Sequence, residues 1–377
     1  MNGRERVCAA FSAEGTPEIA AVIPYEGIYV RDHWSQLTPR PWWAQYAPSV
    51  EEQSAWRRDV ARAVGQDWFD LPIGASRKDR AASSLQERAG RIYLVDARTG
   101  AARQLSPPSV GGWPRGGVAS VHPAHPPQTP DEVDAYIGMP APVDGVLSSG
   151  GADLPRRILS SWGASLYPVG YVPAPLWRCY EMWGFEGMML RVARHPALVQ
   201  HAVKQYTAHA LQQVQLYAQV GALGLWIEDC MTDMISPQAF RSLNLPYLQR
   251  ITAEARHHGL HSIYYYYCGD PGGKWELLLD TGADALALEE SKKGFAIDVE
   301  EVVERVGGRM AVLGNLDAIR LLPHVDEEVL RAEIARQIAA GRRNGSRFIM
   351  SLGSPVTPQT SAERVRQYCE LVHELGR

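Results

Sequence analysis

Two predicted strands separated by one helical segment decide the fold: Ala222-Leu-Gly-Leu-Trp-Ile-Glu228, which Asp229 and Cys230 follow, and His261-Ser-Ile-Tyr-Tyr-Tyr-Tyr267, which Cys268 and Gly269 follow. Each is a short run of apolar and aromatic residues, the composition of a buried strand. Between them, Ser236 followed by Pro237 is a typical helix start, and Gly259 suits the left-handed position after a helix end. Strand, helix and strand at this spacing predict a parallel pair joined by a right-handed crossover.

The same alternation extends in both directions along the chain. It predicts further strands at 164–172, 285–289, 310–314 and 347–352, and helices at 176–193, 196–219, 237–258, 274–281, 299–306, 327–343 and 361–375. With a first strand near residues 19–30, this pattern is nearly a complete (β/α)₈ TIM barrel of the α/β class. The rival is an open doubly wound sheet, but no glycine-rich phosphate-binding motif follows any strand.

The first 155 residues or so are less regular. Clusters of Pro, Trp and Gly predict long loops there, and the segment from Tyr25 to His33 is expected to be the exit loop of the first strand. Residues 91–105 contain two strand-like runs around Gly100, which predict a β-hairpin. We expect one domain spanning 1–377.

Composition excludes several classes of function. The formal net charge is −4, from 38 basic and 42 acidic residues, so no positive field favours nucleic acid or anionic lipid. No apolar run approaches the roughly 20 residues that cross a bilayer, and the N-terminus does not resemble a secretory signal. The five cysteines are dispersed and odd in number, as in a cytoplasmic protein with reduced thiols.

Polar residues follow the predicted strands at the ends where a parallel barrel opens. In order they are Glu228 and Asp229, then Tyr266 and Cys268, then Glu289, and later Asn315. Because the carboxyl ends of barrel strands meet at one mouth, we expect these side chains to surround a common ligand. Glu228, Asp229, Tyr266 and Glu289 are the candidate catalytic residues.

Several motifs in the second half resemble, in order, those of the uroporphyrinogen decarboxylase superfamily. They are Tyr180-Glu-Met-Trp-Gly, Trp226-Ile-Glu-Asp, Ile235-Ser-Pro-Gln-Ala-Phe-Arg, Tyr266-Tyr-Cys-Gly, Leu313-Gly-Asn-Leu-Asp and Pro358-Gln-Thr. The resemblance covers about residues 160–375. It implies a TIM barrel and an activity of one of two kinds, decarboxylation or methyl transfer to a corrinoid protein.

The N-terminal loop separates these two activities. The family's decarboxylases hold porphyrinogen carboxylates with an Arg-Gln-Ala-Gly-Arg-Tyr loop, where this chain has Tyr25-Glu-Gly-Ile-Tyr-Val-Arg-Asp-His33. Acidic and aromatic residues favour a neutral or cationic substrate over a polycarboxylate. The leading hypothesis is therefore transfer of a methyl group from a small methylated or methoxylated substrate to a corrinoid carried by a partner protein, or to another acceptor. The expected substrate-binding residues are Tyr25, Glu26, His33, Trp34, Glu181 and Asn315.

Whether zinc takes part is open from the sequence. The family's zinc-dependent methyltransferases carry a His-x-Cys-Gly motif and a later cysteine, and the corresponding positions here are Tyr266, Cys268 and Ser354. One alternative is a zinc ion held by Cys268 together with a carboxylate such as Glu228. The other is chemistry without a metal, in which Tyr266 donates a proton and Glu228 or Asp229 acts as acid, base or cation stabiliser.

Two other functions stay open. One is a decarboxylase acting on an unusual substrate, and the other is a barrel that has lost catalysis and only binds, which the missing zinc ligands would explain. The exposed face of such a barrel commonly supports a homodimer, so a second copy is an expected partner.

Overall fold

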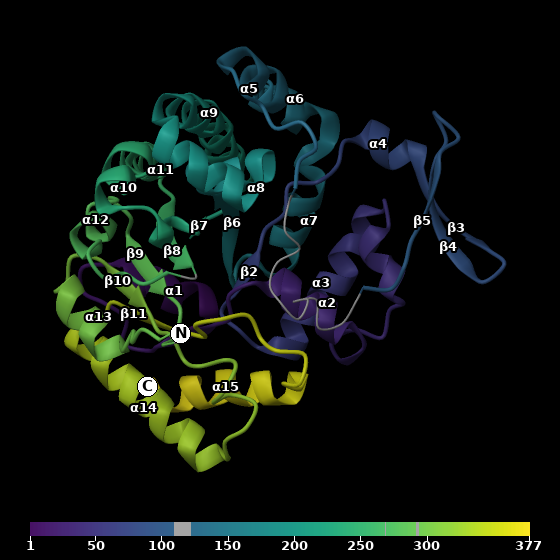
Figure 1. Ribbon diagram of the computed structural model, residues 1–377. Coiled ribbons are helices and arrows are strands. Elements are labelled where there is room, and N and C mark those ends of the chain that lie inside the picture. The colour runs from purple at the N-terminus through teal and green to yellow at the C-terminus, as the bar shows by residue number, and fades with distance from the viewer. Residues whose placement is uncertain (109–121, 268, 292–293) are drawn as a thin grey trace.

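A computed structural model describes residues 1–108, 122–267, 269–291 and 294–377 (Figure 1). Eight parallel strands form one sheet in the order β1-β11-β10-β9-β8-β7-β6-β2. Their bounds are β1 (Ala20–Val22), β2 (Trp68–Asp70), β6 (Tyr167–Pro173), β7 (Gly224–Cys230), β8 (His261–Tyr267), β9 (Ala285–Leu288), β10 (Ala311–Leu313) and β11 (Phe348–Ser351). The predicted TIM barrel is confirmed, including all six strands predicted in the second half of the chain.

The sheet curls until its edge strands β1 and β2 meet. There the Asp67 N–H donates to the Ala21 carbonyl at 2.9 Å, and the Trp68 indole donates to the Ile23 carbonyl at 3.1 Å. These contacts bring the exits of β1 and β2 to the same side of the mouth.

Side chains alternate between the barrel interior and the layer under the helices. On β7, Trp226 belongs to the interior cluster and Ile227 to the cluster that packs against helices. On β8, Tyr265 faces the interior while Tyr264 and Tyr266 face the helices. This alternation decides which strand-end residues can reach a ligand in the mouth.

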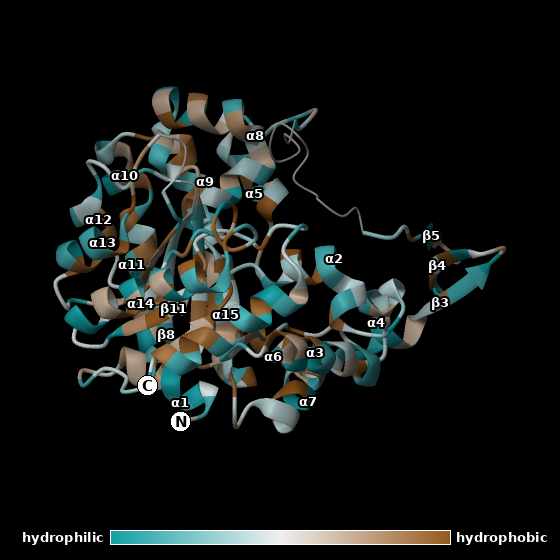
Figure 2. Ribbon diagram, turned by 90° about the horizontal axis from the view of Figure 1, so that it is seen from below, coloured by the Kyte–Doolittle hydropathy of each residue, from teal (hydrophilic) through white to brown (hydrophobic). Residues whose placement is uncertain are grey.

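Helices cover the outside of the sheet, with their apolar residues largely on the inward side (Figure 2). In the second half they are α8 (Pro175–Arg194), α9 (Pro196–Val220), α10 (Pro237–Leu243), α11 (Leu245–His257), α12 (Trp275–Leu279), α13 (Val299–Val306), α14 (Glu327–Arg343) and α15 (Ala362–Leu375). The single helix predicted over 237–258 is two, which break at Asn244 (φ −122°). Pro246 explains the break, because in a continuous helix it would have no N–H to donate to the Ser242 carbonyl and its ring would clash with that carbonyl.

The prediction that the first 155 residues are mainly loops was wrong. This region contains α1 (Gly3–Phe11), α2 (Glu26–Leu37), α3 (Val50–Val64), α4 (Arg77–Ala82), α5 (Pro130–Ile137), α6 (Val143–Val146) and α7 (Asp153–Trp162). The segment from Tyr25 to His33 is the start of α2 and not an exit loop. Pro24 and Gly27 suggested a loop, but both lie at the helix start, where neither disturbs the hydrogen bonds of the helix interior.

The predicted hairpin is confirmed and has a third strand. The antiparallel strands β3 (Ser83–Arg88), β4 (Arg91–Asp96) and β5 (Ala102–Gln104) form a separate sheet. It projects from the side of the molecule as an arm (Figure 1), and Figure 2 shows that β3 is mostly hydrophilic.

Helix α1 covers the amino-terminal end of the barrel. Val7, Ala10 and Phe11 belong to the interior cluster, and the Phe11 ring stacks on His261 with 4.3 Å between ring centroids. None of the helices in the described parts of the chain is both long and apolar enough to cross a membrane.

Candidate active site

A cavity of about 310 Å³ opens at the carboxyl ends of β1, β2, β6 and β7. We call it the mouth cavity. Its described lining combines aromatic, apolar and acidic side chains: Ile23, Pro24, Tyr25, Gly27, Ile28, Trp68, Asp70, Val169, Tyr171, Trp226 and Glu228. No Lys or Arg occurs among these described residues, so the cavity carries negative charge only.

Glu228 is the central polar group of the mouth cavity. Tyr25 donates its hydroxyl to Glu228 Oε1 at 2.9 Å, and Tyr171 donates to Oε2. Glu228 is only 7% exposed, and burial raises the pKa of its carboxyl group, whereas the two tyrosine hydrogen bonds lower it. Because both oxygens accept hydrogen bonds, the carboxylate is held in one orientation beside the cavity.

Aromatic rings form the floor around this carboxylate. Trp226 contacts Tyr265 with ring centroids 4.6 Å apart and Trp68 at 5.5 Å. Tyr25 meets Tyr265 edge-on at 5.6 Å. Ring faces next to a carboxylate form the kind of surface that attracts a methylated cation.

A second cavity of about 410 Å³ shares Gly27, Asp70, Val169 and Tyr171 with the first. We call it the adjoining cavity. Unlike the mouth cavity it carries both signs of charge, from Glu26, Arg31, Arg57 and Asp70.

The two carboxyl groups of the adjoining cavity influence each other. Burial and the negative charge of Asp70 raise the pKa of Glu26, and Arg57 opposes this rise. Gln66 Nε2 donates to Glu26 Oε2 at 2.7 Å. The side chain of Asp70 is exposed to the cavity, but desolvation by the surrounding protein still raises its pKa, and Arg57 lowers it. Glu26 is thus the group that more readily carries a proton.

Asp229 and Tyr266, two predicted catalytic residues, lie on the opposite side of the sheet from the mouth cavity. Asp229 is fully buried and its Oδ2 accepts hydrogen bonds from Asn244 at 2.6 Å and Tyr264 at 2.7 Å. Burial raises the pKa of Asp229 to about 6. The Tyr266 ring packs beneath the helices, with its hydroxyl 3.4 Å from the Asp270 carbonyl.

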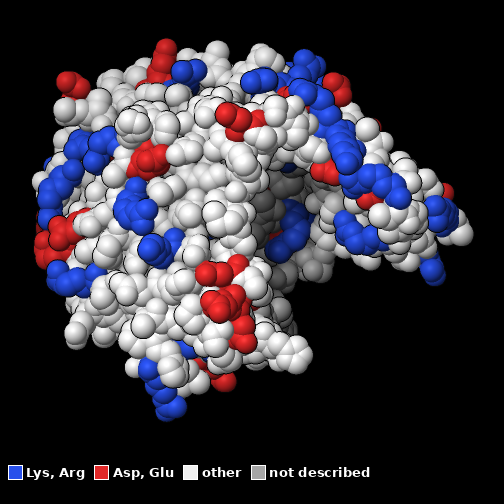
Figure 3. Space-filling view, turned by 90° about the horizontal axis from the view of Figure 1, so that it is seen from above, with Lys and Arg blue, Asp and Glu red and all other residues white. Residues whose placement is uncertain are grey.

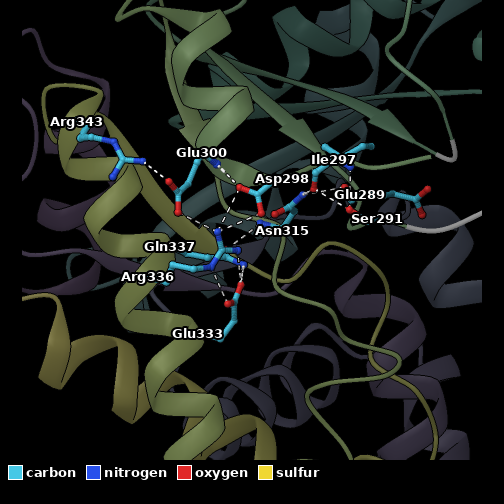
Figure 4. A network of polar contacts seen from close by, with 10 residues as sticks. All are labelled: Glu289, Ser291, Ile297, Asp298, Glu300, Asn315, Glu333, Arg336, Gln337 and Arg343. Atoms are coloured by element: carbon cyan, nitrogen blue, oxygen red, sulfur yellow. Dashed lines mark hydrogen bonds and ion pairs between the residues drawn. The ribbon is translucent and has the colours of Figure 1, made fainter. Parts of the chain in front are cut away.

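Glu289 and Asn315 follow β9 and β10, away from the described lining of both cavities. Ser354 donates to Glu289 Oε1 at 3.4 Å. Asn315 donates its amide to the carbonyls of Glu289 and Ile297, at 3.0 and 2.9 Å, so its side chain holds the loop after β9. Figure 4 shows this contact beside the ion pairs that Arg336 makes with Asp298, Glu300 and Glu333.

The remaining predicted binding residues lie at three different places. Tyr25 and Glu26 line the cavities. His33 and Trp34 are buried in the core, where His33 Nδ1 lies 3.0 Å from the Tyr29 carbonyl and Trp34 donates to the Arg40 carbonyl at 2.7 Å. Glu181 is exposed and forms an ion pair with Arg178 at 3.1 Å.

The described residues do not make up the zinc ligand set of the family. Cys268, the predicted ligand, lies outside them, and within them no group of three His, Cys, Asp or Glu side chains could hold a metal ion. Tyr266 occupies the position of the family's histidine but faces the helices.

Sequence reasoning missed Asp70, Trp68, Tyr171 and Arg57. Asp70 ends a strand of three residues, too short to give a periodic pattern. The carboxylate that follows Trp68-Phe69 was the one available signal. Arg57 lies inside α3, where nothing in the local sequence marks it.

The residues from 152 to 375 match the family model described as uroporphyrinogen decarboxylase (URO-D). The match covers more than half of the chain and includes β6 to β11. The chain belongs to the uroporphyrinogen decarboxylase family.

The chain is also similar to individual proteins in sequence and in structure. The chain is 29% identical to a uroporphyrinogen decarboxylase of Pseudomonas fluorescens over 48% of each chain. It is 32% identical to one of Thioalkalivibrio sulfidiphilus over 43% of this chain and 45% of that one. The chain thus spans about half the length of the curated relatives it matches. A solved methyltransferase from Methanosarcina mazei superposes over 99% of both chains with a TM-score of 0.64 at 16% identity, which shows a shared fold.

Proposed function

We propose that this protein is a methyltransferase of the uroporphyrinogen decarboxylase family that binds a small methylated cation in the mouth cavity. The observation that carries the proposal is the lining of that cavity. Glu228 and Asp70 supply negative charge, and Trp226, Trp68, Tyr25 and Tyr171 supply aromatic surface. A methylated ammonium group fits such a lining, because ring faces and a partly desolvated carboxylate both attract it.

In the reaction, the methyl carbon leaves nitrogen and bonds to an acceptor. The electron pair of the old C–N bond stays on nitrogen, and the acceptor supplies the pair for the new bond. A corrinoid carried by a partner protein is an acceptor of this kind. Glu228, held by Tyr25 and Tyr171, orients the cation, and the aromatic floor excludes water from the reacting carbon.

The alternative within the family is decarboxylation. A polycarboxylate would need cationic partners in the mouth, and the described lining of the mouth cavity has none. Methyl transfer from a cation is therefore the better match to the charge of this cavity.

The test is a transfer assay with free cob(I)alamin as acceptor and ¹³C-methyl-labelled mono-, di-, tri- and tetramethylammonium as donors. Formation of methylcobalamin and of the demethylated amine in equal amounts supports the proposal. Tetramethylammonium binding without turnover would favour a barrel that only binds. Release of carbon dioxide from a carboxylated substrate, with no binding of any methylammonium ion, would overturn the proposal in favour of a decarboxylase.

A further inference from the structure

The two cavities share a wall but differ in charge. The described lining of the mouth cavity is acidic and aromatic, whereas the adjoining cavity also holds Arg31 and Arg57. Figure 3 shows a deep hollow on this face of the molecule with a basic side chain in its wall. A molecule that extends from one cavity into the other would therefore meet negative and then positive charge.

Arg57 is the arginine that is available for a ligand. Its guanidinium stacks on Trp56 with its central carbon 4.0 Å from the ring centroid. Nη1 donates to the Gln53 carbonyl at 2.9 Å and to Gln53 Oε1 at 2.6 Å. Within the described residues it forms no ion pair, although burial lowers its pKa only to about 10, so it stays charged at neutral pH. Glu26 and Asp70 favour its charged form, but neither forms a direct ion pair with it among the described residues, so the held and charged guanidinium can still donate to the carboxylate of a ligand.

Arg31 lines the same cavity but is already neutralised. Its Nε and Nη2 donate to the two carboxylate oxygens of Asp32, at 2.7 and 3.0 Å. Arg31 therefore provides a matched control, an arginine in the same cavity without a free charge.

The carboxyl groups of the adjoining cavity do not prevent an anion from binding there. The raised pKa of Glu26 favours its uncharged form, and Gln66 holds its carboxyl group. Asp70 lines both cavities, so its negative charge also faces the space assigned to the cation.

We infer that the two cavities together bind one bifunctional molecule, with a methylated cationic end in the mouth cavity and a carboxylate against Arg57 in the adjoining cavity. This inference deepens the proposed function and rests on it for the cationic end. It narrows the substrate class to methylated zwitterions.

Isothermal titration calorimetry at neutral pH with three probes tests this assignment. They are 4-(trimethylammonio)butyrate, butyltrimethylammonium and butyrate, which carry both charges, the cation alone and the anion alone. A charge-assisted hydrogen bond to arginine predicts that the zwitterion binds about ten- to a hundredfold more tightly than butyltrimethylammonium. Equal affinities for these two probes would overturn the inference.

Variants locate the effect. In R57Q the zwitterion should bind no more tightly than butyltrimethylammonium, whose own affinity should be unchanged. In R31Q the zwitterion should still bind more tightly than butyltrimethylammonium. R57K should keep part of the difference in affinity, since lysine keeps the positive charge but lacks the planar pair of donors of a guanidinium. Thermal unfolding of each variant checks that it is folded. An advantage that survives in folded R57Q contradicts the role of Arg57.

The titration with butyrate distinguishes failure of the carboxylate site from failure of the proposed cation site. If butyrate and the zwitterion bind through Arg57 but butyltrimethylammonium does not bind, the carboxylate site stands and the cation site of the proposed function fails. If butyltrimethylammonium binds and Arg57 has no effect on any carboxylate probe, the proposed function stands and this inference fails.

Discussion

The carboxylate of Asp67 accepts a hydrogen bond from the backbone N–H of Ala21 at 2.7 Å, across the seam where the barrel closes. The same carboxylate meets Arg6 Nη1 at 3.1 Å from α1 and His373 Nε2 at 2.8 Å from α15. One side chain thus joins the first barrel strand to a helix from each end of the chain. The Asp67 side chain is only 4% exposed, so little solvent competes for its carboxylate.

Replacing Asp67 by alanine should therefore destabilise the fold strongly. Removal of one partner from a buried charged network predicts a loss of about 3 kcal/mol or more in the free energy of unfolding. Urea denaturation measures it. D96A is the control, because Asp96 pairs with Arg98 on the exposed arm, and its loss should be much smaller since water screens an exposed ion pair. Equal losses in the two variants would show that the seam does not depend on Asp67.

Asp229 predicts a pH dependence of stability. Its folded pKa, about 6, lies above the ordinary aspartate pKa of 3.8, so the folded state binds this proton more tightly and stability falls as pH rises between these two values. The difference corresponds to about 3 kcal/mol. D229N removes the titration but keeps an acceptor for Tyr264. Urea denaturation at pH 4 and pH 7 should therefore give a smaller fall for D229N than for the parent protein, and an identical fall would contradict the raised pKa.

Binding of tetramethylammonium should depend on pH through the two carboxylates of the mouth cavity, Glu228 and Asp70, and the part that belongs to Glu228 can be isolated. Only an ionised carboxylate attracts the cation, and the pKa of Glu228 is raised, so affinity should increase as pH rises through the acidic range and then level off. E228Q should bind about tenfold more weakly, a change of about 1.4 kcal/mol, with a flatter pH profile. Calorimetry between pH 5 and pH 8 measures both. E181Q is the control, since Glu181 lies in solvent beside Arg178. A pH profile that is as steep in E228Q as in the parent would contradict the role of Glu228.

Gly170 allows α9 to pack closely on β6. A Cβ at this position would lie 2.4 Å from the ring of Tyr217, which lines the adjoining cavity. G170A should cost about 1–3 kcal/mol, the usual effect of overpacking, measured by thermal or urea unfolding. G145A serves for comparison, because the nearest atom to its added Cβ is 3.9 Å away. If G170A is as stable as G145A, the sheet and helix are not in close contact there.

Much of the barrel could be predicted from the sequence, because the strands and helices of the second half are long enough to show the spacing of apolar residues that is typical of each. Strand 261–267 and helix 299–306 were predicted with the bounds that the structure has. In the first third, the strand predicted near residues 19–30 contains β1, but its bounds were wrong and β2 was missed, because β1 and β2 have three residues each. Such short strands give no alternation, and proline at helix starts looks like loop chemistry.

The candidate site was only partly predictable, for a geometric reason. Glu228 and Asp229 are neighbours on one strand, so at most one can face the interior, and both were predicted to act. The sequence did not show which face was inside. Asp70 and Arg57 reach the cavities only through the closure of the barrel and the packing of α3, which are long-range contacts.

Helix α1 covers the amino-terminal end of the barrel, so a ligand reaches the mouth cavity from the carboxyl ends of the strands. A ligand that lies against Trp226 therefore has to bind before a second molecule covers the opening of the mouth cavity, and it can leave only after that molecule has left. For the proposed methyl transfer we therefore expect the two substrates to bind in a fixed order, the small methyl donor first and the bulky acceptor last.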